Sequence, residues 1–368
     1  MAVQVSYAPN VATRAIQLFA SDVDPHALEL LRANHSAKTV YHDVRAREFP
    51  AARIHLYGAG PPCQPFTREG CQHGTDDARG RLIMESVDFV LAAQPLVFFL
   101  ENTDALVNFK GGAFFTSIME RLKTLYSVQF RVCNATEWGI PQYRKRVYIV
   151  GRHVDVADAV SIELRPDKFP TKLHVDDVLR PLLEHEDASR RPAASHQRFA
   201  VDSAIAFESN QRVDAGFVAT RHSAQWVVNG KVRVRQTLPA LTHSSNPNET
   251  AWVLQRGRGL LHTEAARFQG IQFHRHVWPK PKIVLQLVGN SMAGSIVADI
   301  LEQTFTGFFG AGNSPWYTGA MGELLRADAK SDMVIGFLRN HSCLCVQIPG
   351  PWLPLPFPLC FLAPRGPS

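Results

Sequence analysis

The stretch IQLFASDVDPHALELLRAN, residues 16–34, indicates the fold most directly. Its apolar first half is typical of a buried strand, and the acids Asp22 and Asp24 follow where that strand should end. Pro25 suits the first position of a helix that Asp24 caps, and the leucines after it repeat on one helical face. The stretch therefore predicts a strand followed by a helix, which is the repeating unit of α/β proteins.

The same alternation continues as far as residue 150. Further strands are expected at residues 40–43, 54–57, 96–100, 127–132 and 146–150, with helices at 81–93 and 114–125. This order predicts an α/β fold with a doubly wound, mostly parallel sheet. Ligands of such sheets bind at the carboxyl ends of the strands. The candidate residues that follow predicted strands are Asp22, Asp43, Cys63 and Glu101.

The rest of the chain is organised differently. Residues 152–257 show no clear alternation and are predicted to form a smaller domain. Residues 258–305, with helices expected near 263–269 and 291–303, are predicted to return to the first domain, which is residues 1–151. Residues 306–368 form an extension of uncertain structure with a proline-rich tail. Residues 221–282 hold ten Lys or Arg against two Asp or Glu, which favours a polyanionic partner.

Composition excludes several classes of protein. A chain of 368 residues that is 45% hydrophobic is not mainly disordered. No apolar run approaches the roughly 20 residues of a membrane helix. The opening residues show no basic segment followed by an apolar core, so secretion is not expected. Six cysteines make no disulfide framework, so an intracellular location is expected, in a nucleus or in a nucleoid or cytoplasm. Cys343 and Cys345 are too close in sequence for a structural zinc site, so surface or tail cysteines and no metal are expected.

Cys63 lies in a stiff loop, Gly60-Pro-Pro-Cys-Gln-Pro-Phe-Thr67, after a predicted strand. The usual interpretation of such a residue is an inert buried cysteine in a turn. However, Glu101 and Asn102 end the next strand, and Gln142-Tyr-Arg-Lys-Arg146 precedes another. A thiol, a carboxyl group and two guanidinium groups at one sheet edge suit nucleophilic attack on an electron-poor ring.

With these residues the sequence resembles the cytosine-C5 DNA methyltransferase family. The matching motifs, in order, are Pro62-Cys63-Gln64 with Asp77-Ala-Arg79-Gly80, Glu101-Asn102, Gly139-Ile-Pro-Gln142-Tyr-Arg144-Lys-Arg146, Glu264-Ala-Ala-Arg267-Phe-Gln-Gly270 and Gly289-Asn290-Ser291. The resemblance implies a Rossmann-like methyltransferase sheet with a target-recognition region at residues 152–257. It also implies DNA (cytosine-5-)-methyltransferase activity that depends on S-adenosylmethionine.

The resemblance implies a role for each catalytic residue. Cys63 would add as thiolate to C6 of a flipped cytosine, while Glu101 would hold and protonate its N3/N4 edge. Arg144 and Arg146 would contact the base and its phosphate neighbourhood. The residues expected to position the loop and the substrate are Pro62, Gln64 and Asn102.

The resemblance also implies a cofactor site for S-adenosylmethionine. Asp22 would hold the ribose hydroxyls, and Asp43 would meet the adenine amino group while Val44 packs on the ring. Asn290 and Ser291 belong to the late motif that returns to this end of the sheet. The alternative for each aspartate is a cap or turn residue.

One family motif is absent from its usual place. Family members open with a strand and a Phe-x-Gly-x-Gly turn, whereas this chain has no glycine before Gly58. We expect the first strand of the sheet to be missing or displaced. Three explanations stay open: a truncated chain or incorrect start, a divergent or inactive enzyme, and a circular permutation that uses Phe-Phe-Gly-Ala-Gly at residues 308–312.

The expected partner is double-stranded DNA, because the basic stretch suits duplex phosphates. Methylation of tRNA is the alternative within the family, and an inactive nucleic-acid-binding homologue is the alternative outside it. No membrane partner is expected, and the chain is predicted to be a monomer.

Overall fold

A computed structural model of the chain provides the structure. Strands are labelled β, α-helices α and single 3-10 turns η. The residues that it describes are 16–35, 37–50, 53–62, 66, 78–158, 160–166, 173–180, 217–218, 227–228, 231–232, 236–241, 251–253, 258–271, 279–309 and 343–347.

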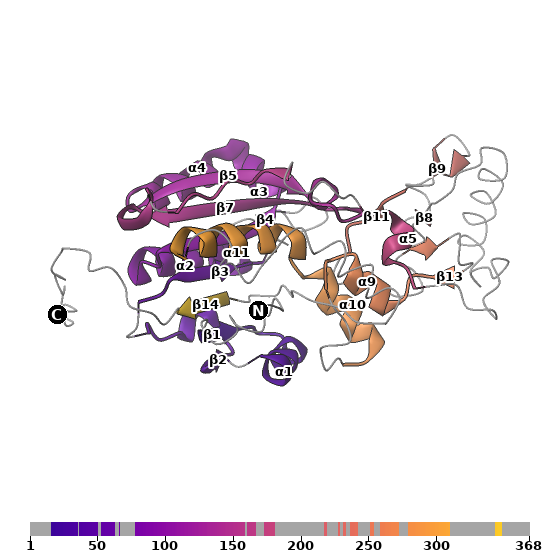
Figure 1. The fold of residues 1–368 in the computed structure, drawn as a ribbon, viewed down its shortest axis with the longest axis horizontal. Coiled ribbons are helices and arrows are strands. Elements are labelled where there is room, and N and C mark those ends of the chain that lie inside the picture. The colour runs from indigo at the N-terminus through magenta and orange to yellow at the C-terminus, as the bar shows by residue number, and fades with distance from the viewer. Residues whose placement is uncertain are drawn as a thin grey trace.

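A seven-stranded sheet with helices on both faces forms the larger part of the protein (Figure 1). The strands in chain order are β1 (Ile16–Ser21), β2 (Thr39–Tyr41), β3 (Leu56–Ala59), β4 (Val97–Thr103), β5 (Tyr126–Asn134), β7 (Lys145–His153) and β14 (Cys343–Gln347). The helices and turns are α1 (Pro25–Asn34), η1 (Val44–Ala46), α2 (Ala78–Ala93), α3 (Ala105–Asn108), η4 (Phe109–Gly112), α4 (Ala113–Lys123), η5 (Ala135–Trp138), η6 (Val154–Val156) and α11 (Gly294–Phe309). The strands and helices predicted between residues 16 and 150 are thereby confirmed, with small shifts at their ends.

Helix α1 begins where the sequence predicts. The Asp24 carboxylate accepts hydrogen bonds from the backbone amides of His26 (2.8 Å) and Ala27 (3.4 Å), with Pro25 at the first helical position. These amides have no partner inside the helix, so the aspartate fixes the helix start.

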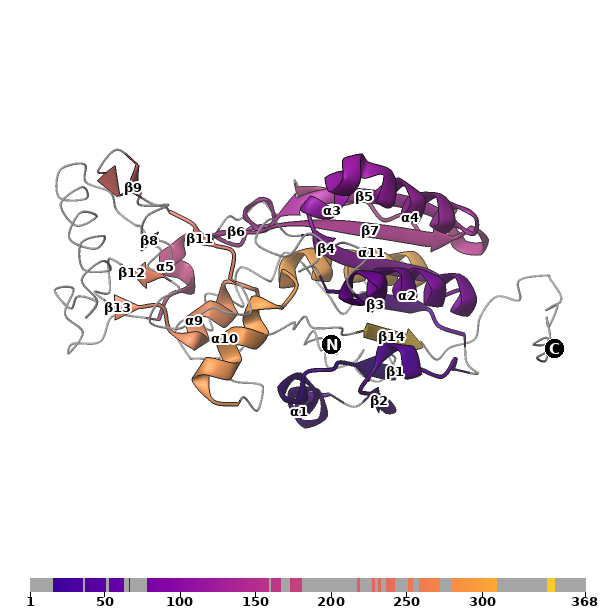
Figure 2. The same cartoon turned by 180° about the vertical axis from the view of Figure 1, so that it is seen from behind.

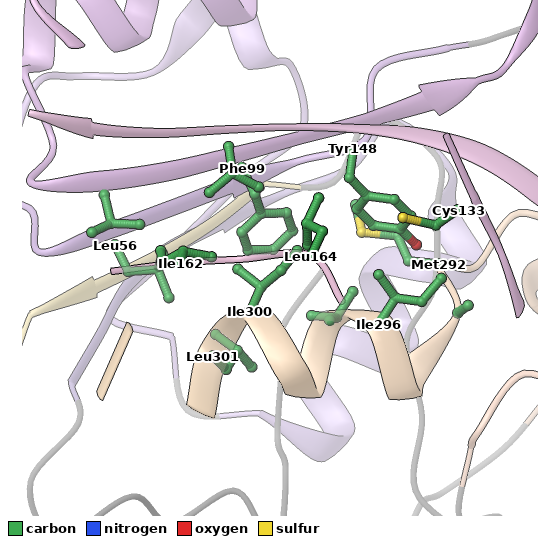
Figure 3. Packing of buried hydrophobic residues seen from close by; sticks show 14 of the residues in the cluster. Leu56, Phe99, Cys133, Tyr148, Ile162, Leu164, Met292, Ile296, Ile300 and Leu301 are labelled. Atoms are coloured by element: carbon green, nitrogen blue, oxygen red, sulfur yellow. The ribbon is translucent and has the colours of Figure 1, made fainter. Parts of the chain in front are cut away.

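The sheet separates two apolar cores. One core joins α1 and α11 to one face of the sheet, and the other joins α2 and α4 to the opposite face. Phe99 points into the first core while its neighbours Phe98 and Leu100 point into the second, as the alternation of a buried strand requires. Figure 2 shows the second face, with α2 in front of the strands and α11 behind them. In Figure 3, Ile300 of α11 lies beneath the Phe99 ring, and Ile296 of the same helix lies beneath Met292.

The strand directions differ from the mostly parallel sheet that we predicted. The order is β2-β1-β14-β3-β4-β7-β5, and β7 and β14 run against the other strands. β5 and β7 are joined through residues 135–144. A connection this short suits an antiparallel pair, because a parallel pair needs a longer crossover.

β14 lies at the centre of the sheet, between β1 and β3. Cys343 pairs with both Ser21 and Ala59, so β14 starts at the carboxyl ends of its two neighbours. Of the surface or tail positions expected for Cys343 and Cys345, a structureless tail is therefore wrong, because both belong to a strand of the sheet. A strand in this position satisfies backbone groups of β1 and β3 that would otherwise lack partners.

A strand from the C-terminal region thus lies between β1 and β3 and runs in the opposite direction to both. The missing or displaced first strand stays a prediction. Phe308 and Phe309, the first residues of the motif in the permutation hypothesis, end α11, and the hypothesis stays a prediction. Gly310 and Gly312 lie outside the described residues.

A smaller part of the protein has its own apolar core, which unites residues from 173–179, 238–253, 260–271 and 284–288. Its elements, together with the short strand that leads into it, are β6 (Gln142–Tyr143), α5 (Val175–Val178), β8 (Phe217–Val218), β9 (Val227–Val228), β10 (Lys231–Val232), β11 (Leu238–Pro239), β12 (Trp252–Val253), β13 (Arg258–Gly259), α9 (His262–Arg267) and α10 (Pro281–Gly289). Helices α9 and α10 pack in this core, and α11 then crosses to the large sheet. Figure 1 shows this part beside the end of the sheet from which β6 emerges.

Within the described ranges, no single helix is both long and apolar enough to cross a membrane. Residues 283–289 and 294–304 pass that test only as a pair bent by 54°.

Candidate active site

Asp22 follows β1 at the carboxyl edge of the sheet. Its side chain is fully buried, and its carboxylate accepts a hydrogen bond from the Asp24 amide at 3.0 Å. The Ser21 hydroxyl beside it is also buried and has no hydrogen-bonding partner in the protein. Asp22 is thus held at the end of its strand by the same turn that starts α1.

β3 and β4 bring the start of the cysteine loop beside Asn102. The Asn102 amide donates to the Pro61 carbonyl oxygen at 3.2 Å and accepts from the Thr103 amide at 2.8 Å. Pro61 and Pro62 are buried, so this end of the loop is fixed against the sheet. Cys63 and Gln64 lie outside the described residues.

Glu101 and Arg146 form a buried ion pair on neighbouring antiparallel strands. The Glu101 side chain has no exposed surface, and its Oε1 lies 3.3 Å from Nε of Arg146, whose side chain is 14% exposed. Glu101 is directly opposite Tyr148 in the pairing of β4 with β7, and Thr103 is opposite Arg146. The Glu101 and Arg146 side chains thus lie on one face of the sheet.

The structure corrects the prediction for Arg144. Its guanidinium group donates to the carbonyl oxygens of Leu241 (3.0 Å), Ser291 (2.6 Å) and Gly289 (3.3 Å). The side chain is 1% exposed, so it does not reach a phosphate at the surface. Arg144 instead ties the start of β7 to the end of α10 and to the smaller part.

Asp43 has the contacts of a cap. Its Oδ1 accepts from the Arg45 amide at 2.8 Å, and its Oδ2 lies 2.6 Å from the Arg45 guanidinium. The neighbouring carboxylate raises the pKa of Arg45. Val44 is buried in the core beneath α2. These contacts match the alternative of a turn residue, and the adenine contact stays a prediction.

Asn290 and Ser291 close α10 at the point that Arg144 holds. The Ser291 hydroxyl donates to the Val288 carbonyl at 2.7 Å, and its own carbonyl accepts from Arg144. The Asn290 Nδ2 atom is buried without a hydrogen-bonding partner.

The motif at residues 264–270 organises the smaller part. Glu264 is fully buried and paired with Arg258 at 2.8 Å, and it accepts a hydrogen bond from the Arg180 amide at 3.0 Å. Gly270 has φ +73°, and a Cβ there would lie 3.3 Å from the Gly294 Cα. Glycine is needed at Gly270 for both reasons, since α11 starts against it.

Several buried polar atoms around this edge lack partners within the protein. They include Ser21 Oγ, Tyr148 OH, Asn290 Nδ2 and both amide atoms of Gln142. Buried polar groups are nearly always hydrogen-bonded in proteins, so such atoms mark places that a polar ligand or water completes. Of these atoms, Ser21 Oγ belongs to the residue next to Asp22 at the end of β1.

A family model described as C-5 cytosine-specific DNA methylase matches residues 11–306 of the chain. The chain belongs to this family. The methylase is 35% identical over 301 residues to the type II methyltransferase M.NlaX of Neisseria lactamica, an alignment that covers 78% of this chain and 87% of the relative. It is 39% identical to M.NgoBV of Neisseria gonorrhoeae over 161 residues, which cover 41% of this chain and 36% of the relative.

Two solved structures share the fold of this methylase. The Entamoeba histolytica methyltransferase EhMeth matches with a TM-score of 0.54 at 16% identity, over 78% of this chain and 89% of that one. A putative DNA modification methyltransferase from an Escherichia coli prophage matches with a TM-score of 0.53 at 19% identity, over 79% of this chain and 92% of that one. At such identities the likeness concerns the fold, which is that of an α/β methyltransferase.

Two residues of the methylase were not singled out from the sequence. Tyr148 is two residues after Arg146 in β7, so both side chains lie on the same face of the sheet. This spacing is the feature of the sequence from which Tyr148 could have been predicted. Cys133 is a fully buried cysteine whose thiol pKa is raised by burial, so it is a core residue without thiolate character. In the part of the chain that the structure describes, no group of three His, Cys, Asp or Glu is placed to hold a metal ion.

Proposed function

We propose that this methylase transfers a methyl group from S-adenosylmethionine to C5 of a cytosine in double-stranded DNA. The observation that carries the proposal is the buried Glu101–Arg146 pair, which lies beside a loop start that Asn102 holds at Pro61. The printed descriptions of the family and of the type II relatives favour DNA over tRNA as the substrate.

The proposed reaction uses Cys63 as nucleophile. The thiolate forms a bond to C6 of cytosine, and C5 thereby gains the electron pair that attacks a methyl group. S-adenosylmethionine supplies that methyl group when it is bound. A basic group then removes the C5 proton, and the electron pair of that C–H bond forms the C5–C6 double bond while the bond between sulfur and C6 breaks. Cys63 leaves as thiolate, and N3 returns its proton to Glu101.

Glu101 is proposed to hold the N3/N4 edge of the cytosine and to protonate N3. Arg146 keeps the carboxyl group in place through the ion pair, and its guanidinium contacts the base. The reacting atoms of a cytosine that is stacked inside a duplex cannot be reached by protein side chains such as Glu101 and Cys63. The cytosine must be flipped out, at a cost of roughly a few kcal/mol.

The residues that would hold S-adenosylmethionine are Asp22 for the ribose hydroxyls and Asn290 for a polar group near the end of α10. The unpartnered Ser21 hydroxyl and Asn290 amide support this proposal, because a bound polar molecule would complete them. Asp43 and Ser291 already have protein partners, so their contribution is secondary.

The test is transfer of tritium from labelled S-adenosylmethionine to mixed-sequence duplex DNA or to tRNA. The full chain should label DNA and not tRNA, and Cys63→Ser should abolish the label. Cys71→Ser is the matched control, because it changes the next cysteine along the chain. Label retained in Cys63→Ser would remove Cys63 as nucleophile. DNA binding without any labelling by the full chain would instead favour an inactive homologue.

A further inference from the structure

Tyr148 carries a polar group that the fold does not use. The residue lies in the middle of β7, and its side chain has no exposed surface. Its hydroxyl is buried and has no hydrogen-bonding partner among the residues that the structure describes. Figure 3 shows the ring beside Cys133 and Met292, above the start of α11. Phenylalanine would fill the same space without burying an unpaired hydroxyl, so packing does not explain the choice of tyrosine.

Tyr126 shows how this protein treats a tyrosine hydroxyl with a structural role. Tyr126 is also buried, and its hydroxyl donates to the Pro95 carbonyl oxygen at 2.9 Å. That bond joins β5 to the turn before β4. Tyr148 has no equivalent bond, although both tyrosines belong to the same sheet.

The position of Tyr148 points to the proposed acid. In the pairing of β4 with β7, Tyr148 is directly opposite Glu101, and Arg146 is two residues away on the same strand. Side chains at paired positions lie on one face of the sheet with their Cβ atoms roughly 5 Å apart. The Tyr148 and Glu101 side chains therefore start from paired positions on the same face of the sheet.

The electrostatics keep the phenol protonated. Burial raises the pKa of Tyr148 well above its ordinary value, and the Glu101 carboxylate raises it further. The hydroxyl is therefore a permanent donor at any pH at which the enzyme works.

We propose that Tyr148 is a positioning residue for the reaction. When the cytosine is bound, its hydroxyl donates a hydrogen bond to the Glu101 carboxyl group and holds that group in its working orientation. The bond is absent in the free protein, and catalytic hydrogen bonds of this kind commonly tighten only in the complex. This inference rests on the function proposed above. Tyr148 acts through Glu101 and touches neither the base nor the methyl donor.

The test compares Tyr148→Phe with Tyr126→Phe in steady-state methyl transfer to duplex DNA and in thermal unfolding. Tyr148→Phe should lower kcat by about tenfold or more, the range for a lost hydrogen bond to a charged group, with the KM for DNA unchanged. Its melting temperature should equal or exceed that of the wild type. Tyr126→Phe should show the reverse, a lower melting temperature with kcat unchanged.

Each other outcome overturns the proposal. Equal kcat in Tyr148→Phe and the wild type would mean that the hydroxyl has no part in the reaction. A melting temperature that falls together with kcat would assign Tyr148 a structural role. A wild-type chain that transfers no methyl group would overturn the proposed function and this inference with it, whereas an active wild type with an equally active Tyr148→Phe overturns this inference alone.

Discussion

Arg144 and Arg146 of one motif have different partners, although only Lys145 separates them. Arg146 belongs to β7 and shares a sheet face with Glu101, which is its partner in the ion pair. Arg144 precedes the strand, where the alternation of side chains does not apply, and its guanidinium is enclosed by three carbonyl oxygens. A guanidinium has five donors in a fixed fork, so it can join three separate segments at once.

The first prediction concerns Arg144→Met. Without the guanidinium, three buried carbonyl groups lose a charged donor, and the free energy of unfolding in urea should fall by about 3 kcal/mol. Lys145→Met is the control, because the Lys145 side chain is exposed, and it should change stability by less than about 0.5 kcal/mol.

The same Arg144 variant tests the correction to its role. If Arg144 makes no phosphate contact, the slope of log affinity for DNA against log salt should equal that of the wild type. If the slope of the variant were smaller in magnitude by about 0.9, Arg144 would contact one phosphate, as the sequence predicted.

At the scale of elements, β14 lies inside the sheet, between β1 and β3. It satisfies the backbone groups of β1 and β3 and separates two strands that run in one direction. Its antiparallel direction brings Cys343 to the carboxyl edge, where Asp22 and Pro61 follow their strands. The C-terminal region therefore contributes to the edge that carries the candidate site.

The second prediction concerns β14. Cys345 pairs with both Phe19 and Tyr57, so Cys345→Pro removes a ladder bond inside the sheet, and the melting temperature should fall as expected for a loss of about 3 kcal/mol. Gln347→Pro is the matched control, because Gln347 pairs with Ile16 alone, and its effect should be smaller. Equal effects of the two prolines would contradict the central position of β14.

At the scale of the whole molecule, the large sheet and the smaller part are joined by few polar anchors. Arg144 reaches Leu241 on one side and Ser291 on the other, while Gly270 lets α11 start against the loop after α9. The three apolar cores are otherwise built from separate sets of residues.

The third prediction concerns stability as a function of pH. Burial, with help from Arg53, lowers the pKa of His55 from 6.5 to about 4 in the folded state. Between pH 6.5 and pH 4 the unfolded chain therefore binds more protons than the folded protein does. The free energy of unfolding is unaffected by His55 titration above pH 6.5, and it falls as pH drops through this window. Burial lowers the pKa of His153 and His262 in the same direction.

Urea unfolding at pH 7 and at pH 4.5 measures this effect. The wild type should lose up to about 3 kcal/mol through His55, and His55→Phe should lose less. The same pH dependence in both proteins would show that His55 is already charged in the folded state.

The sequence by itself determined the local elements and the chemistry. Asp24 and Pro25 start α1 through contacts within a few residues, and the apolar runs of β3 and β4 give buried strands wherever they are placed. The motifs assigned Glu101 and Arg146 to one site, because Glu101 ends one predicted strand and Arg146 begins another.

Only the tertiary structure decided which partners those residues have. The enclosure of Arg144, the central place of β14 and the position of Tyr148 opposite Glu101 all depend on segments that are distant in the chain. Local pattern specifies which face of a strand is buried, but strand order and register come from the packing of the whole sheet.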